Sequence, residues 1–312
     1  MRPMVPDRAS AAEGGFTAFG WQGINLTVPS TWNLVFTQGD YRKGHIRLAD
    51  DASVRLEMRW DLSREAYSPS STVNTYLARL RKKAKKDGTS LSVQRDLHLA
   101  SPIGKDVECY RWVADQQAVA MMSRCTQCSR AVHVQLLGSP AEPLKGLGRT
   151  VFSSLRDHPD NGTHLWRFFD VEFRSPADLP LARQSLQSGC IRMLFAKGLM
   201  RLEFVRASLA EMLLAGTDLA QWFEQFYAKS LKRRSFSMHS AAVRSHPGIR
   251  IEGRVWLLVN PLRLLGRPRV VRGACWHCED TNRLFICCFD GPKGQADVLA
   301  QAIEGFRCCE NV

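Results

Sequence analysis

The sequence contains no apolar run that approaches the roughly 18–20 residues needed to span a bilayer. Residues 1–6, Met-Arg-Pro-Met-Val-Pro, also lack the apolar core of a secretory signal. We therefore expect no transmembrane segment. Ten cysteines in such a chain are typical of a reducing cytoplasm, where thiols serve as small apolar residues or metal ligands rather than in disulfides. The sequence thus predicts a cytoplasmic protein.

The motifs of the common catalytic sites are also missing. The sequence has no G-x-S-x-G, no Walker glycine loop, no H-E-x-x-H and no G-x-G-x-x-G after a predicted strand. Its eight histidines are scattered, and His239, His246 and His277 have no recognisable ligand spacing. Repeated strand glutamates such as Glu57 and Glu203 lie beside arginines and favour cross-strand ion pairs over acid catalysis. We expect a protein that is not an enzyme.

Size and charge narrow the remaining classes. At 312 residues, 45% of them hydrophobic, the chain is long enough for two ordinary globular domains. Its formal net charge of +13 favours salt-sensitive association with an acidic protein, an acidic lipid surface or nucleic acid. A basic surface that serves only solubility is the alternative.

The sequence is repeated internally, and the offset stays between 144 and 150 residues. Gly104, Val107, Glu108 and Trp112 recur as Gly248, Ile251, Glu252 and Trp256, and Cys125 and Cys128 recur as Cys275 and Cys278. The repeat predicts a tandem duplication. We expect a disordered tail over residues 1–15, a first domain over 16–157, a linker over 158–163 and a second domain over 164–312.

The hydrophobic pattern within each repeat predicts many strands and few helices. Residues 23–29 and 54–60 alternate apolar and polar side chains, as half-buried strands do. Residues 73–86 have helical spacing and end at Asp87-Gly88. The second repeat predicts strands near 168–173, 191–195 and 199–205 and a helix over 219–233. This order favours an α+β fold, a mainly antiparallel sheet covered by helices.

The opening "G-x-x-L-x-V-P-x-x-W" over Gly23–Trp32 resembles the PsbP-like family. That family includes the extrinsic photosystem II subunit and a small Ran-binding nuclear transport factor. In the second repeat, residues 173–176 (Phe-Arg-Ser-Pro) replace Val28-Pro29. The resemblance implies a PsbP-like sandwich that acts as a binding or accessory domain without catalytic machinery, and it implies no particular functional residue.

The two CxxC pairs are the candidate metal ligands. A two-residue spacer lets both thiolates reach one zinc ion from a tight turn. If duplicated domains bring equivalent turns together, then Cys125, Cys128, Cys275 and Cys278 would hold one structural zinc. Burial of these cysteines without metal is an alternative. A redox pair at Cys275-Trp-His-Cys278 is another, although the segment after it reads as a strand and offers no helix N-terminus to lower a thiol pKa.

Clusters of cations are the candidate partner-binding residues. Helix capping accounts for one or two such residues, and the clusters contain more. They occupy the ends of the two predicted helices and a proline-containing insert of the second repeat. These residues are Arg79, Arg81, Lys82, Lys83, Lys85, Lys86, Lys229, Lys232, Arg233, Arg234, Arg263, Arg267, Arg269 and Arg272.

The sequence therefore predicts a non-catalytic binding or scaffold protein that contacts a protein partner, or another acidic surface, through its basic residues. A zinc or redox protein that uses the CxxC pairs is an alternative, and a nucleic-acid binder is another.

Overall fold

The computed structural model describes residues 15–62, 68–100, 102, 104–159, 161–231, 234–255 and 269–309. The chain divides into two compact units, unit 1 (Met1–His158) and unit 2 (Pro159–Val312). Among the described residues, no helix combines the length and the apolar character needed to cross a lipid bilayer.

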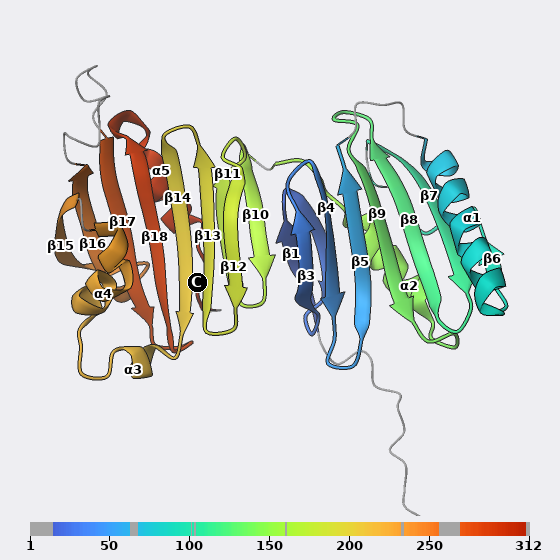
Figure 1. Cartoon of the computed structure of the whole chain (residues 1–312), viewed down its shortest axis with the longest axis horizontal. Coiled ribbons are helices and arrows are strands. Elements are labelled where there is room, and N and C mark those ends of the chain that lie inside the picture. Colours follow the sequence, from blue (N-terminus) through green and yellow to red (C-terminus); the bar gives the residue numbers. More distant parts are fainter. Residues whose placement is uncertain are drawn as a thin grey trace, which may run out of the picture. The chain divides into compact units, whose positions relative to one another are not determined.

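Unit 1 contains nine strands and two helices in its described part (Figure 1). The strands are β1 (Phe16–Trp21), β2 (Ile24–Pro29), β3 (Asn33–Gly39), β4 (Lys43–Ala49), β5 (Val54–Asp61), β6 (Ser92–Gln94), β7 (Lys105–Val113), β8 (Gln117–Cys125) and β9 (Ala131–Gly138). The helices are α1 (Pro69–Asp87) and α2 (Leu144–Ser153).

Unit 2 follows with a similar set of elements. Its strands are β10 (Thr163–Phe168), β11 (Val171–Pro176), β12 (Leu181–Gln187), β13 (Cys190–Lys197), β14 (Met200–Ser208), β15 (Arg234–Val243), β16 (His246–Val255), β17 (Arg269–Cys278) and β18 (Arg283–Pro292). Its helices are α3 (Ala210–Leu213), α4 (Leu219–Leu231) and α5 (Asp297–Glu304), with a 3₁₀ turn at Lys293–Gln295.

The two units have the same sheet topology. Unit 1 has a seven-stranded sheet in the order β3-β4-β5-β9-β8-β7-β6, and unit 2 has one in the order β12-β13-β14-β18-β17-β16-β15. Neighbouring strands in both sheets are antiparallel. Each unit also begins with a two-stranded hairpin, β1–β2 or β10–β11. Strand β8 of unit 1 therefore corresponds to β17 of unit 2, and helix α1 corresponds to α4.

Each large sheet is covered in part on both faces. In unit 1, Ala120 and Met122 of β8 pack against Val73 of α1. Val119 points to the other face, where Gly148 of α2 lies so close that a side chain there would meet it. Strand β8 is apolar on both faces because helices cover both of them, as is usual for a central strand.

The predicted α+β sandwich, a sheet covered by helices, is wrong. Antiparallel strands dominate the described chain, and α1 packs on β7 and β8 at one end of the unit 1 sheet (Figure 1). The residues of β4 and β5 on that side are polar, with His45, Arg47, Glu57 and Arg59 alternating with buried apolar residues. Such alternation indicates a sheet face that stays open rather than one that a helix layer covers.

Candidate functional site

Helix α1 begins and ends at well-defined caps. The Ser68 hydroxyl accepts a hydrogen bond from the Ser71 amide, and Pro69 occupies the first helical position. At the other end Gly88 adopts a left-handed conformation (φ 68°) and its amide donates to the Ala84 carbonyl. Only Val73 and Leu77 are buried, so the helix rests on the sheet along a narrow stripe and its other faces are open to solvent.

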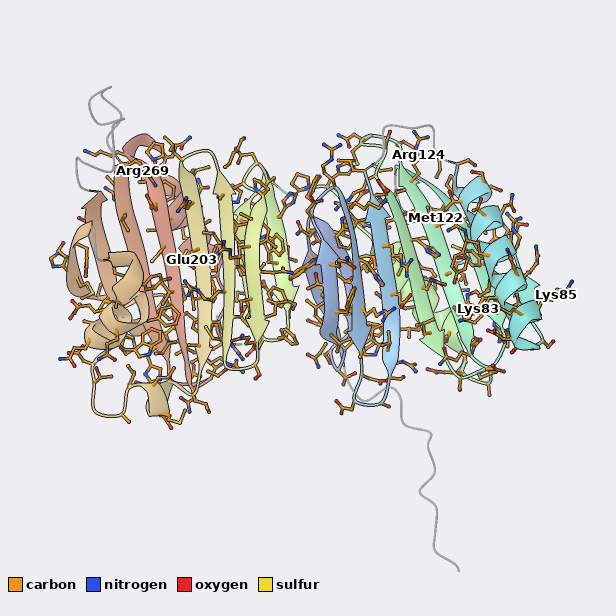
Figure 2. The ribbon with its side chains drawn as sticks, viewed as in Figure 1. Lys83, Lys85, Met122, Arg124, Glu203 and Arg269 are labelled. Carbon is orange, nitrogen blue, oxygen red and sulfur yellow. The ribbon has the colours of Figure 1, made fainter. Side chains whose placement is uncertain are left out.

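The basic face of α1 consists of Arg79, Arg81, Lys82, Lys83, Lys85 and Lys86. All six side chains are exposed, and within the described part of the chain none forms an ion pair or a side-chain hydrogen bond. Lys83 and Lys85 lie on this helix in Figure 2. The helix dipole stabilises cations in its last turn, where Lys85 and Lys86 lie. The dipole does not account for the four cations that precede them.

An open groove of about 1140 Å³ runs beside α1 over the uncovered part of the unit 1 sheet. Its wall is the side of α1 that carries Thr75, Tyr76 and Arg79, and its floor includes Arg59 of β5 and His133 of β9. The rim is the β3–β4 turn. We call this cavity the unit 1 groove.

The unit 1 groove has an excess of positive charge. Four cations line it, Arg42, Lys43, Arg59 and Arg79, against the two carboxylates Asp40 and Asp61. Both carboxylates are engaged. Asp61 pairs with Lys43 at 3.0 Å, and Asp40 Oδ1 accepts the amides of Arg42 (2.7 Å) and Lys43 (3.1 Å). Arg59 and Arg79 have no ion-pair partner among the described residues, so they remain available to a ligand.

Beside Arg59, the floor of the groove is formed by a layer of neutral aromatic side chains. The Tyr110 hydroxyl lies 2.7 Å from His133 Nε2, and the Tyr76 hydroxyl donates to Gln135 Oε1 at 2.8 Å. Burial, with a smaller contribution from Arg59, lowers the pKa of His133 to about 4. Burial also raises the pKa of Tyr110. Because both groups are neutral near pH 7, the charge of the groove comes from its arginines and lysines.

The cations predicted in the second repeat are less well defined. Lys232, Arg233, Arg263 and Arg267 lie outside the described residues, as do the side chains of Lys229 in α4 and Arg234 in β15. Arg269 and Arg272 belong to strand β17 rather than to a loop, and both are half-buried. Arg269, labelled in Figure 2, forms an ion pair with Asp290 at 2.6 Å, so its charge is already balanced within unit 2.

Unit 2 has its own groove of about 640 Å³ beside α4, lined by five aromatic side chains together with three arginines and two carboxylates. Arg192 pairs with Glu203 at 2.7 Å and lies over the ring of Phe226 at 5.1 Å. Glu203 also accepts a hydrogen bond from the Tyr227 hydroxyl at 2.8 Å. The two grooves occupy equivalent places in the two units, but only the unit 1 groove lies beside the basic face of α1.

The second CxxC pair is split by strand geometry. Cys275 and Cys278 are three positions apart in β17, so their side chains point to opposite faces of the sheet. Cys275 is buried in the core around Trp222 and Phe223, and burial raises its pKa well above the usual value. A redox pair needs the opposite shift. Cys128, by contrast, lies in the turn after β8, which Cys125 ends.

The structural counterpart of Cys125 is Cys278, because each is the last residue of its strand, β8 or β17. The sequence repeat pairs Cys125 with Cys275, three residues away. The predicted four-cysteine zinc site stays a prediction, and the geometry of unit 2 does not support the participation of Cys275.

Two groups of metal-ligating side chains are found among the described residues. The His246 group contains His246, Cys278, Cys308 and Cys309 of unit 2. Its potential ligand atoms all lie within 4.8 Å of one another. His246 Nε2 is 3.2 Å from Cys308 Sγ and 3.6 Å from Cys309 Sγ. These residues could hold a metal ion.

The Cys125 group contains Cys125, Cys128, Asp157 and His158 of unit 1. Cys125 Sγ is 2.9 Å from His158 Nε2. Asp157 Oδ1 forms an ion pair with Lys105, while its Oδ2 has no hydrogen-bond partner among the described residues. Burial raises the pKa of Cys128.

The sequence pattern indicates the cations of α1 and three of the clustered cysteines, Cys125, Cys128 and Cys278, but not the groove or the other ligands. His158 lies in the predicted linker, and His246 has no recognisable ligand spacing in the sequence. The adjacent pair Cys308-Cys309 is a further signal, but its partners lie 30 or more residues away along the chain. Arg42, Lys43 and Arg59 gave no signal because single strand and turn cations are common.

Comparisons with known proteins show no family for this sequence. No protein-family model matches the sequence, and no curated protein matches it. Immunity protein TplEi of the T6SS from Pseudomonas aeruginosa, solved in complex with "L" peptide, aligns with 96% of this chain and 99% of its own, at 9% identity and a TM-score of 0.32. A chain of the Tle4-Tli4 complex aligns with 94% of this chain and 97% of its own, at 9% identity and a TM-score of 0.35. Both TM-scores are low, and neither likeness supports an argument about fold or function. The PsbP-like resemblance stays a prediction.

Proposed function

We propose that this chain is a non-catalytic binding protein of a reducing compartment, whose unit 1 contacts an acidic segment of a protein partner. The basic face of α1 and the unit 1 groove together would form the contact surface. The observation that carries the proposal is the set of six exposed cations on one helix with no ion-pair partner in the described chain, beside a groove with surplus positive charge.

Charge complementarity indicates the class of partner. Unbalanced surface cations attract acidic partners and raise the rate of encounter more than they raise affinity. A partner segment rich in Asp and Glu would place carboxylates along α1 and in reach of Arg59 and Arg79. Those two residues line the groove, so the segment would be held on two sides.

Nucleic acid fits the same surface less well. Single strands are held by aromatic side chains that stack on bases. Of the aromatic residues that line the groove, Tyr76 and Tyr110 form hydrogen bonds to Gln135 and His133 and pack against each other (ring centroids 6.1 Å apart). Trp60, which also lines it, is buried and donates to the Asp40 carbonyl at 2.8 Å.

The test measures binding of a fluorescein-labelled 20-residue peptide rich in Asp and Glu by anisotropy. The variant Lys82→Glu/Lys83→Glu/Lys86→Glu should weaken binding about tenfold or more, because each exposed charge contact contributes about 0.2–1 kcal/mol and each reversal adds repulsion. The matched control, Lys145→Glu/Arg149→Glu/Lys293→Glu, makes the same change in net charge on exposed residues elsewhere.

Equal weakening in both triple variants would mean that only net charge matters and would refute the proposed surface. A labelled duplex DNA of the same length serves as the competing probe. Tighter binding to the duplex, lost in the α1 variant and steeply reduced by salt, would favour the nucleic-acid alternative instead.

A further inference from the structure

Three segments of unit 2 that are far apart in sequence converge at one corner of its sheet. Strand β16 begins at His246 and β17 ends at Cys278. The β16–β17 register ends with Gly248 paired with Trp276, and His246 and Cys278 each lie two residues beyond this pair. Cys308 and Cys309 follow α5, where Arg307 is held by an isolated bridge to Glu172 of β11.

We propose that His246, Cys278, Cys308 and Cys309 form a structural Zn²⁺ site in unit 2. The residue types are those of the Cys₃His class, which closes the coordination shell of zinc and leaves no position for a substrate. The site is independent of the proposed binding function, because it lies in the other unit and involves none of the residues of the basic face.

The distances between the donor atoms fit a tetrahedral ion. Zinc–sulfur bonds of about 2.3 Å and zinc–nitrogen bonds of about 2.0 Å place neighbouring ligand atoms about 3.5–3.8 Å apart. His246 Nε2 already lies 3.2 and 3.6 Å from the two C-terminal sulfurs, and all four donors lie within 4.8 Å of one another. Small side-chain adjustments would therefore complete the shell.

The surroundings of the group favour a bound cation. Cys278 and Cys308 are buried, at 0% and 5% exposure. On binding, zinc would displace the proton of each coordinating thiol to solvent and stabilise the buried thiolate. Trp276 lies two residues before Cys278 in β17, on the same face of the strand, and its buried Nε1 has no hydrogen-bond partner among the described residues. Such an N–H is a suitable donor to a metal-bound sulfur.

At the equivalent corner of unit 1, the positive charge is the ammonium group of Lys105. Lys105 at the start of β7 is paired with Cys125 at the end of β8, and in unit 2 His246 begins β16 and Cys278 ends β17. Asp157 follows Arg156, which bridges to Asn25 just as Arg307 bridges to Glu172. Lys105 and Asp157 form an ion pair with side chains only 3% and 1% exposed. Unit 2 has His246 and Cys308 where unit 1 has Lys105 and Asp157. Because unit 2 has no lysine at this place, its ligand side chains could bind a metal cation instead.

Zinc content of the full chain, purified under reducing conditions, tests the site. We expect one Zn²⁺ per chain by plasma emission spectrometry, and less than about a tenth of that in Cys278→Ser and His246→Ala. His246→Cys, which keeps a ligand, should retain the ion. The matched controls are Cys275→Ser, in the same strand but on the other face, and Cys125→Ser, at the equivalent position of unit 1. Both should keep one zinc.

Cobalt substitution of the unmutated protein gives a readout that does not depend on variants that fold. Tetrahedral Co²⁺ with thiolate charge-transfer absorption would support the site, whereas an octahedral spectrum would overturn it. Failure of the reduced wild-type chain to take up zinc, retention of zinc in Cys278→Ser, or its loss in Cys125→Ser or Cys275→Ser would each overturn the proposal as well.

Discussion

Lys105 and Asp157 form an ion pair that water scarcely reaches. Removing two charges from water is costly, and their mutual attraction offsets that cost only while both are present. The pair lies beside Cys125 and His158, so it fixes the loop after α2 against the end of β8. The contribution of the pair to the stability of unit 1 is best measured by removing one of the two partners.

We predict that Asp157→Ala lowers the free energy of unfolding by about 3–5 kcal/mol, because Lys105 is left as an unpaired buried charge. The double variant Lys105→Met/Asp157→Leu should lower the free energy of unfolding clearly less, since it removes both charges. Urea unfolding monitored by fluorescence measures both. Asp178→Ala breaks the exposed pair with Lys197 (3.1 Å) and should change stability by about 1 kcal/mol at most. If Asp157→Ala lowered the free energy of unfolding no more than Asp178→Ala does, the prediction would be refuted.

His133 should make stability depend on pH. Its pKa is about 4 in the folded chain and 6.5 without the fold, so the unfolded state binds its proton first as pH falls. The stabilising effect is complete above pH 6.5 and is lost as pH falls toward 4, by at most about 3 kcal/mol. The difference in unfolding free energy between wild type and His133→Gln should shrink over this range. A difference that does not vary with pH would show that His133 is not held neutral.

Among the elements, α1 and the central strands follow directly from sequence pattern. The spacing of Val73 and Leu77 and the Asp87-Gly88 stop predict a helix that the structure contains as Pro69–Asp87. The five residues 118–122 of β8 are all apolar, which is typical of a strand between two covered faces. The helix over 219–233 and the strands near 191–195 and 199–205 are likewise found as α4, β13 and β14.

The elements that sequence pattern missed lack a local signal. The strand predicted near residues 168–173 is interrupted at 169–170, the turn between β10 and β11, where Phe169 adopts a left-handed conformation (φ 49°). Phe-Asp is not a typical sequence for such a turn, unlike Gln22-Gly23 of the first hairpin. The edge strands β3 and β12 are mostly not buried and therefore show no apolar alternation. The ligand groups depend on strand ends that only the sheet register brings together.

Two glycines in helical contexts should respond oppositely to alanine. Gly88→Ala should destabilise by about 1 kcal/mol, because alanine at a φ of 68° is strained although there is space for its side chain. Gly146→Ala, within α2 and also in open space, should stabilise by about 0.4–1 kcal/mol because it restricts the unfolded chain. Thermal unfolding of the two variants measures this. The same sign in both would contradict the assignment of Gly88 as the α1 cap.

Across the whole chain, one sheet topology carries two sets of side chains. Unit 1 has the cationic groove, the basic face of α1 and a buried lysine–aspartate pair. Unit 2 has the aromatic groove and the His246 group. The two units thus share a strand order but differ in the side chains of their grooves and strand ends.

Removal of zinc should therefore weaken unit 2 selectively. A structural ion present at 1,000 times its dissociation constant contributes about 4 kcal/mol. After chelation we expect faster hydrogen exchange at the start of β16, the end of β17 and α5, with peptides of β7, β8 and α2 unchanged. Equal acceleration in both units, or none in unit 2, would contradict a structural role for the His246 group.

Capture of a native partner tests the binding proposal most directly. Wild-type protein, the α1 triple reversal and the matched control reversal are immobilised in parallel, and retained proteins are quantified by mass spectrometry after nuclease treatment. The account predicts an acidic protein that the wild type and the control retain and the α1 variant loses, with retention falling as salt is raised. Retention of the same proteins by all three, or signals that vanish with nuclease, would contradict it.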